Sequence, residues 1–135
     1  MDSLVYALIQ VVHNIGAVAV VGLSTFGWVG HQTTVLQRRI LSLIGLAWLI
    51  QALSGPAFGI ATYRFYGEFP DIHGVAIGAL IIKIICLLSG LLLVARVILK
   101  RGDQARQALA GVVFARQFAL GVTALSAAAF LRWYS

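Results

Sequence analysis

The chain has 135 residues, of which 61% are hydrophobic and 10% are charged. A soluble domain carries about 25% charged residues, so this composition cannot cover a water-facing surface and excludes an ordinary soluble protein. The net charge of +6 comes from Lys and Arg residues between apolar segments, and not from a separate basic face, which argues against nucleic-acid binding. We therefore expect a single domain, residues 1–135, whose main partner is the lipid bilayer.

Four long apolar segments follow one another along the chain. The first two contain no Asp, Glu, Lys or Arg, the third contains Lys83 and Arg96, and the fourth contains Arg116. Each exceeds the roughly 20 residues that a membrane-spanning helix needs. Continuous apolar segments favour helices over the short alternating strands of a barrel. The sequence predicts an all-α protein with helices at about 4–30, 40–63, 72–98 and 107–132.

Short connections join these segments, so neighbouring helices are expected to be antiparallel and to form a four-helix bundle. Lys and Arg gather at two of the connections, the first and the third: Arg38, Arg39, Arg96, Lys100, Arg101 and Arg106. Short loops rich in Lys and Arg stay in the cytoplasm. Both termini and the second connection are then predicted to face the periplasm, in a multi-pass protein of a bacterial inner (plasma) membrane.

Two glycine pairs have the spacing that brings membrane helices close together. Gly55 and Gly59 form one pair, and Gly74 and Gly78 form the other. A small residue at every fourth position lets two helix backbones approach closely. We expect these glycines to lie at helix–helix contacts.

Histidines are the first candidates for chemistry, because a polar residue at membrane depth indicates function. His13 lies inside the first helix, and His73 opens the third helix on the same outward side. His13 either forms a hydrogen bond to a neighbouring helix or is a ligand to copper or haem iron. A copper site at the outer rim would use Met1, His13 and His73. With three histidines in the chain, a two-haem site is excluded.

Other polar residues lie within the apolar segments. Lys83 is near the middle of the third helix, far from any acidic residue. We expect it to bond to backbone carbonyls, to lose its proton, or to meet an anionic group of a ligand or partner subunit. Arg116 is expected to extend towards the cytoplasmic face. With Asn14, Gln51 and Gln117 it forms the set of structural polar residues expected in the membrane.

Nothing in the sequence favours catalysis. The sequence shows no acidic pair suited to acid–base catalysis, no combination of a nucleophile with a catalytic histidine, and no glycine-rich phosphate loop. We predict that the protein is not an enzyme.

Three motifs resemble the copper resistance protein D family. In the first predicted helix, the motif His13–Ala17, with glycines further along, is similar to the family's opening helix of a histidine, small residues and glycine. A basic pair and an apolar helix that ends in glycine follow at Arg38–Gly55. The third motif is Gly78–Lys83 with an apolar stretch reaching Arg96. The resemblance covers residues 6–101 and implies a bacterial membrane protein associated with copper uptake or tolerance.

Three hypotheses for the function remain open. The first is copper handling at the outer face, or an accessory role in a larger membrane complex with other membrane subunits or a homo-oligomer. The second is a single-haem b-type cytochrome subunit in quinone-linked electron transfer, with His13 and His73 as axial ligands and Lys83 facing the haem propionates. The third is a purely structural membrane subunit.

Overall fold

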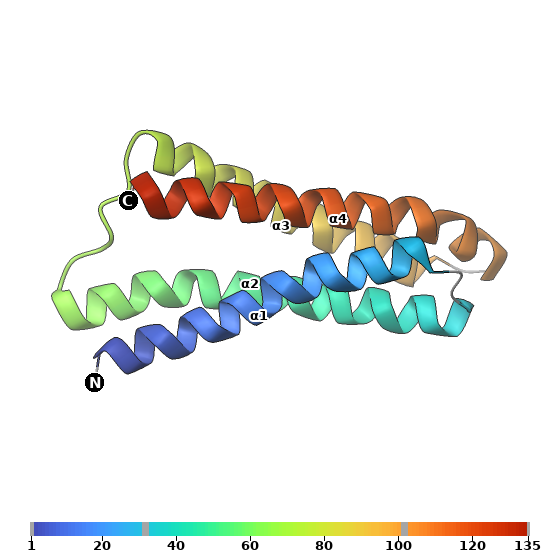
Figure 1. Ribbon diagram of the computed structural model, residues 1–135, viewed down its shortest axis with the longest axis horizontal. Coiled ribbons are helices and arrows are strands. Elements are labelled where there is room, and N and C mark those ends of the chain that lie inside the picture. The colour runs from blue at the N-terminus through green and yellow to red at the C-terminus, as the bar shows by residue number, and fades with distance from the viewer. Residues whose placement is uncertain (1, 31–32, 101–102, 135) are drawn as a thin grey trace.

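The computed structural model describes residues 2–30, 33–100 and 103–134, and these contain four helices and no strand. The helices are α1 (Asp2–Val29), α2 (Thr34–Tyr66), α3 (Val75–Leu99) and α4 (Asp103–Tyr134) (Figure 1). All four are long and apolar enough to cross a membrane. The prediction of an all-α fold with four helices that are apolar enough to span a membrane is confirmed for the described residues.

Helix α2 begins at Thr34, earlier than residue 40, where the apolar segment starts. The Thr33 side chain caps the helix, because its Oγ1 accepts a hydrogen bond from the Leu36 N–H at 3.4 Å. The basic residues Arg38 and Arg39 therefore lie inside the helix and not in the connection before it. At the other end, Gly67 adopts a left-handed conformation with φ 76° and stops the helix.

Helix α3 begins later than the sequence indicated, at Val75 and not at residue 72. Gly74 precedes it with φ 56°, a conformation that glycine adopts without steric cost. His73 consequently lies in the connection before α3 and not in its first turn. Its backbone carbonyl accepts a hydrogen bond from the Ala76 N–H at 3.2 Å.

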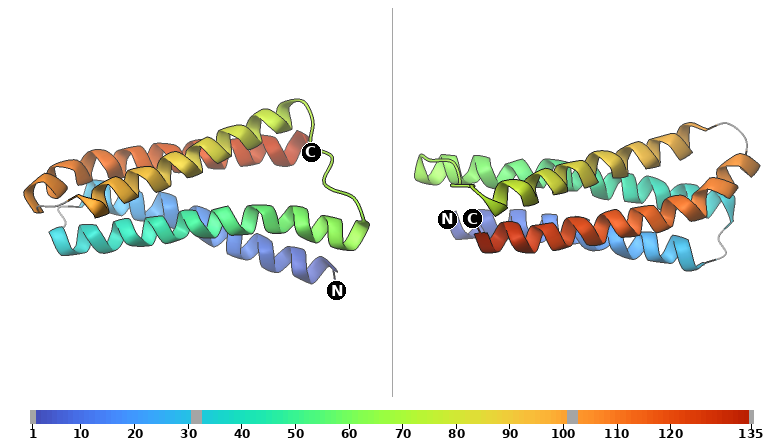
Figure 2. Two further views of the ribbon diagram at one scale, coloured as in Figure 1. Left: turned by 180° about the vertical axis from the view of Figure 1, so that it is seen from behind. Right: turned by 90° about the horizontal axis from the view of Figure 1, so that it is seen from above.

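The four helices form two pairs, α1 with α2 and α3 with α4 (Figure 1). Helix α1 also packs against α4, and α2 against α3, so α1 and α3 lie diagonally opposite each other. Both termini and the α2–α3 connection lie at one end of the molecule, which we call the terminal end. The other two connections lie at the opposite end, which we call the basic end. Seen from behind, the two pairs separate towards the terminal end (Figure 2).

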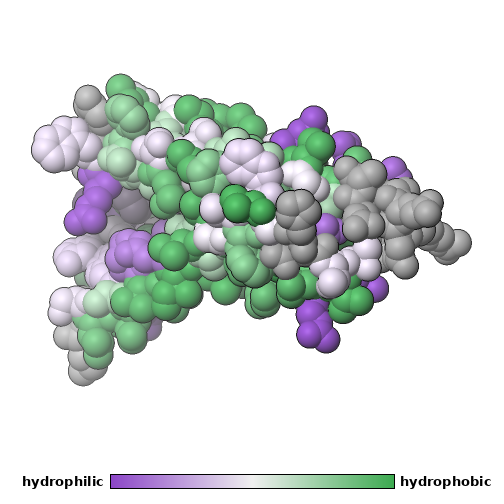
Figure 3. Space-filling view, turned by 45° about the vertical axis from the view of Figure 1, so that its right-hand side comes forward, coloured by the Kyte–Doolittle hydropathy of each residue, from purple (hydrophilic) through white to green (hydrophobic). Residues whose placement is uncertain are grey.

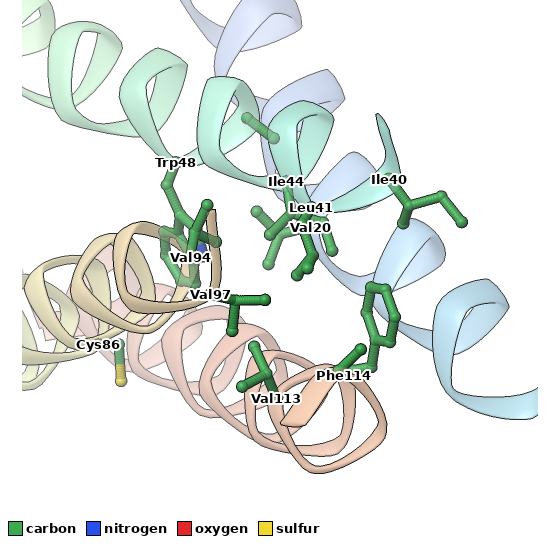
Figure 4. Packing of buried hydrophobic residues seen from close by; sticks show 12 residues of the cluster. Val20, Ile40, Leu41, Ile44, Trp48, Cys86, Val94, Val97, Val113 and Phe114 are labelled. Atoms are coloured by element: carbon green, nitrogen blue, oxygen red, sulfur yellow. The ribbon is translucent and has the colours of Figure 1, made fainter. Parts of the chain in front are cut away.

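Large buried side chains are concentrated in the half of the bundle next to the basic end (Figure 4). They come from the second halves of α1 and α3 and the first halves of α2 and α4, and include Val20, Leu41, Ile44, Trp48, Val94, Val97, Val113 and Phe114. In the terminal half, the buried apolar residues are the small Ala61, Ala76, Ala79 and Ala127. The apolar core therefore holds the four helices together mainly near the basic end.

Apolar side chains also cover much of the outside of the bundle (Figure 3). Leu4, Val18 and Leu53 are examples, each with more than half of its surface exposed. Such exposed surface is unfavourable in water but costs nothing against lipid tails. The outer surface therefore agrees with contact to a lipid bilayer.

The expected glycine pairs do not make the close contacts. A Cβ added at Gly55, Gly59 or Gly78 would meet nothing within 4 Å, so the expectation is wrong for these positions within the chain. Gly27 and Gly90 make such contacts instead. An added Cβ at Gly27 would come within 2.5 Å of the Phe114 ring, and one at Gly90 within 2.5 Å of the Trp48 ring.

One hydrogen-bond network joins three helices at the terminal side of the core. Gln117 of α4 is fully buried, with 0% of its surface exposed. Its Oε1 accepts a hydrogen bond from Trp48 Nε1 of α2 at 2.8 Å, and its Nε2 donates to the Gly90 carbonyl of α3 at 2.7 Å. The missing side chain of Gly90 makes room for the Trp48 ring. One amide therefore satisfies the buried indole and fixes the positions of three backbones.

We predict that Gln117→Ala lowers the free energy of unfolding by about 1–2 kcal/mol, because it leaves the buried Trp48 N–H without an acceptor. Cys86, the single cysteine, is buried with 3% of its surface exposed, so its reaction with a thiol dye during heating in detergent reports opening of the bundle. Gln37→Ala is the matched control, since the Gln37 side chain has no hydrogen bond to a described residue. Equal heating curves for the two variants would refute the role of the network.

Candidate functional site

The most prominent polar contact in the terminal half joins α1 to α2. His13 of α1 is half-buried, and its Nδ1 lies 2.8 Å from the Oγ of Ser54, a buried residue of α2. The edge of the imidazole meets Phe58 of α2, with the ring centroids 5.9 Å apart. The histidine is thus held on two sides by the neighbouring helix.

The Ser54 hydroxyl determines which nitrogen of His13 carries the proton. Ser54 Oγ donates its only hydrogen to the Ile50 carbonyl at 2.6 Å. It can therefore only accept in its contact with His13, so the imidazole must donate from Nδ1. In the neutral ring the other nitrogen, Nε2, then keeps its lone pair. Nε2 is the atom of His13 that can bind a metal ion or accept a hydrogen bond.

The backbone at His13 is held as well as the side chain. Gln51 of α2 donates a hydrogen bond from Nε2 to the His13 carbonyl. Gly16, one turn further along α1, leaves the space that the Gln51 amide occupies, because an added Cβ there would come within 2.6 Å of it. Closer to the terminal end, Tyr6 donates to Thr62 Oγ1 at 2.9 Å. Polar contacts thus fix α1 against α2 where the apolar core is absent.

Lys83 approaches this site from the other helix pair. It is half-buried on α3, and it is the charged residue that interacts electrostatically with His13. Helices α1 and α3 do not pack against each other in the described part of the chain, so this interaction acts across the space between the two pairs. Figure 3 shows the molecule hollowed at the terminal end, with hydrophilic side chains beside the hollow. Among the described side chains, the carboxylates Glu68 and Asp71 both lie in the α2–α3 connection, so Lys83 has no acidic partner within the helices.

His73 lies elsewhere, in the exposed connection before α3. Its Nδ1 is 3.0 Å from the Asp71 carboxylate. The helical stretch from Val75 to Lys83 rises about 12 Å, so His73 lies roughly two turns nearer the terminal end than Lys83. No contact between His13 and His73 occurs among the described residues, and their shared ligand site stays a prediction.

The remaining candidate residues have different surroundings. Met1 lies outside the described residues. Asn14 accepts a hydrogen bond from Gln10 of its own helix at 2.7 Å and does not bond across helices. Arg116 is exposed on α4, while Cys86 packs in the apolar core. Within the described ranges, no group of three His, Cys, Asp or Glu residues is arranged to hold a metal ion.

Two residues of the site, Ser54 and Phe58, were missed by the sequence analysis. Ser54 follows Gln51 by three residues, so both lie on the same face of α2. Two hydrogen-bonding residues on one face of an uncharged stretch of a membrane helix indicate a polar partner on the adjacent helix. That spacing is the signal that could have found Ser54, whereas nothing distinguishes Phe58 from other apolar residues of the chain.

Comparison of the chain with models of protein families, with curated proteins and with solved structures finds no match. The resemblance to the copper resistance protein D family therefore stays a prediction based on the histidine, lysine and arginine motifs. The function has to be inferred from the geometry around His13.

We predict that the neutral His13 ring carries its proton at Nδ1 and leaves Nε2 unprotonated, because Ser54 offers only an acceptor. Nitrogen-15 NMR of histidine-labelled protein in detergent distinguishes the two nitrogens. Ser54→Ala removes the acceptor and is expected to abolish the preference, while His73 provides an internal signal from an exposed ring. A His13 that carries its proton on Nε2 would contradict the hydrogen-bond assignment.

Proposed function

We propose that the chain is a non-enzymatic accessory subunit of a membrane complex, and that it contributes His13 to a copper site shared with a partner subunit or a second copy. The observation that supports this proposal is the hydrogen bond that orients His13 and leaves its Nε2 lone pair free. Metal-binding histidines typically have such a partner on the other nitrogen. The family resemblance adds copper as the metal to test first.

The donor atoms of the chain fit copper only in part. His13 supplies one nitrogen, and a single ligand does not bind copper tightly. His73 is paired with Asp71 in the connection, and the soft sulfur of Cys86 is buried in the core. For these reasons we place most of the remaining copper ligands on a partner subunit or a second copy. Met1 and His73 are the candidates for any further ligand from this chain.

Lys83 restricts what such a partner brings to the site. When Lys83 is protonated, its charge disfavours a metal cation at His13 unless an anionic donor compensates it. A thiolate or carboxylate from the partner would satisfy both the metal ion and Lys83. The lysine therefore favours a partner with an anionic ligand.

The same lysine supports a second candidate, a b-type cytochrome subunit in quinone-linked electron transfer. A haem carries propionates, and a basic residue beside an axial histidine suits them. This function needs a second axial ligand, which would be His73 or a histidine of another subunit. The haem would supply the electron-transfer chemistry when bound, and His13 would orient it. If neither metal nor haem is found, the subunit is purely structural.

We also propose an antiparallel bundle in a bacterial inner membrane, with both termini and the α2–α3 connection in the periplasm. The placement of the termini at one end supports it (Figure 1). Arg38, Arg39 and Lys100 lie at the opposite end, where the rule for basic residues assigns the cytoplasm. The outer side of the proposed copper site is then the periplasmic side.

This orientation predicts which end of the bundle a membrane-impermeant thiol reagent reaches in intact cells. In a Cys86→Ala background, a cysteine at Glu68 is expected to react from outside, while one at Arg39 reacts only after the membrane is opened. The side chains of Glu68 and Arg39 are both exposed in the structure, so a difference in labelling reports the side of the membrane and not burial. Labelling of Arg39→Cys in intact cells would contradict the proposed orientation.

For the metal site, we predict that gently extracted protein retains copper, that His13→Ala abolishes it, and that Ser54→Ala weakens binding by about 10–100-fold. Metal analysis and an absorption spectrum are measured on the same samples. Asn14→Ala, one residue along on the exposed side of α1, is the matched control and should keep the metal.

The spectrum separates the alternatives. A Soret band that disappears in His13→Ala supports haem and contradicts copper as the resident group. Copper that survives His13→Ala contradicts a role of this histidine, and the absence of both signals leaves the structural function.

A further inference from the structure

A second polar feature lies near the basic end, away from His13. Helices α3 and α4 form a groove of about 360 Å³ on the outside of the bundle. Two arginines line it, Arg96 of α3 and Arg116 of α4, together with Ser89 and the apolar Leu92, Leu93 and Leu120. Neither the copper nor the haem proposal uses any of these residues.

Both arginines are without a counter-ion among the described side chains. They are exposed and have no ion pair or hydrogen bond with another described side chain. The described carboxylates, Glu68 and Asp71, lie beyond the opposite end of α3. Both arginines fall within the membrane-spanning stretches Val75–Leu99 and Leu109–Trp133. An uncompensated charge at such a position is unfavourable unless an anion or water reaches it.

The two arginines lie at different depths below the basic end. Arg96 precedes the end of α3 by three residues, about 4.5 Å. Arg116 lies deeper, because its neighbour Gln117 bonds to Gly90, which precedes the end of α3 by nine residues, about 13.5 Å. Arg96 therefore lies near the level of the lipid phosphates, and the long side chain of Arg116 can extend towards the same level.

The order of residues along the groove is the same on both helices. From the basic end towards the middle of the membrane, α3 presents Arg96 and then Leu93 and Leu92, while α4 presents Arg116 and then Leu120. The groove is thus cationic towards the basic end and mainly apolar further in, with Ser89 the deepest lining residue of α3. A phospholipid has the complementary order, with its phosphate at the surface and its acyl chains deeper.

We propose that this groove, the Arg96–Arg116 groove, binds one anionic phospholipid of the leaflet at the basic end. Each guanidinium can donate two parallel hydrogen bonds to phosphate oxygens, and the leucines contact an acyl chain. An inorganic phosphate ion would satisfy the arginines but leave the apolar half of the groove unused. A basic groove between membrane helices is a known form of anionic-lipid site.

The test is native mass spectrometry of the extracted protein, titrated with phosphatidylglycerol or with phosphatidylcholine of identical acyl chains. The wild type is expected to prefer phosphatidylglycerol by at least tenfold. Arg96→Gln and Arg116→Gln should each weaken phosphatidylglycerol binding about fivefold, and the double variant should bind the two lipids equally. Arg132→Gln removes the same charge from α4 outside the groove and should behave as the wild type.

Two further variants separate the groove from a general effect of charge. Arg96→Lys and Arg116→Lys keep the charge but lose the paired hydrogen bonds, so each should show an intermediate affinity. The protection of Cys86 from a thiol dye confirms that every variant is folded.

Equal weakening by Arg132→Gln, or equal binding of both lipids by the wild type, would overturn the proposal. Displacement of the lipid by millimolar inorganic phosphate would also overturn it, because the site would then recognise phosphate without the acyl chains.

Discussion

The interaction on which this bundle depends is the amide of Gln117, which a lipid-embedded protein must satisfy internally. An unpaired amide or indole in the interior costs about 1–3 kcal/mol. Gln117 meets this constraint by accepting from Trp48 and donating to the Gly90 carbonyl. Separating α2, α3 and α4 at this point would take these groups away from their partners. The network therefore fixes the relative positions of three helices that apolar contacts alone would specify weakly.

The network also marks the boundary between two differently stabilised halves. Towards the basic end, Phe114, Ile44 and Val94 interlock in an apolar core. Towards the terminal end, hydrogen bonds from Tyr6 and Gln51 hold α1 to α2, while the α3–α4 pair diverges. Placing His13 and Lys83 in this second half leaves them able to meet a ligand. In the tightly packed half, neither side chain would have space for one.

Much of the fold could be predicted from the sequence, because length and lack of charge determine membrane helices almost by themselves. The ends of the helices were harder. Helix α2 begins at the Thr33 cap and ends at Gly67 in its left-handed conformation. Each of these signals is a single residue, so neither changes the average hydropathy of the segment. Gly55 and Gly59 have the spacing of a helix contact, but spacing does not say which face meets a neighbour. Gly90 makes such a contact only because Trp48 lies opposite it.

The candidate site could be predicted only in outline. His13 and Lys83 stand out because polar residues are rare in membrane helices. The partner of His13 could not be found without the structure, since Ser54 is one of several hydroxyl residues in the chain and pairs with it over a separation of 41 residues. The sequence placed His73 at the start of the third helix, on the same outward side as His13. The late start of α3 instead leaves His73 in the α2–α3 connection beside Asp71.

The small residues buried in the terminal half have a mechanical consequence. Contacts made by Ala61, Ala76, Ala79 and Ala127 bury little area and do not interlock, so separating them forfeits little free energy. The Gln117 network and the core beyond it resist separation far more strongly. The two helix pairs are thus held together firmly at the Gln117 network and the core, whereas at the terminal end they can separate at a low cost in free energy. The rigidity of the terminal end therefore depends on the ligand or partner that binds there.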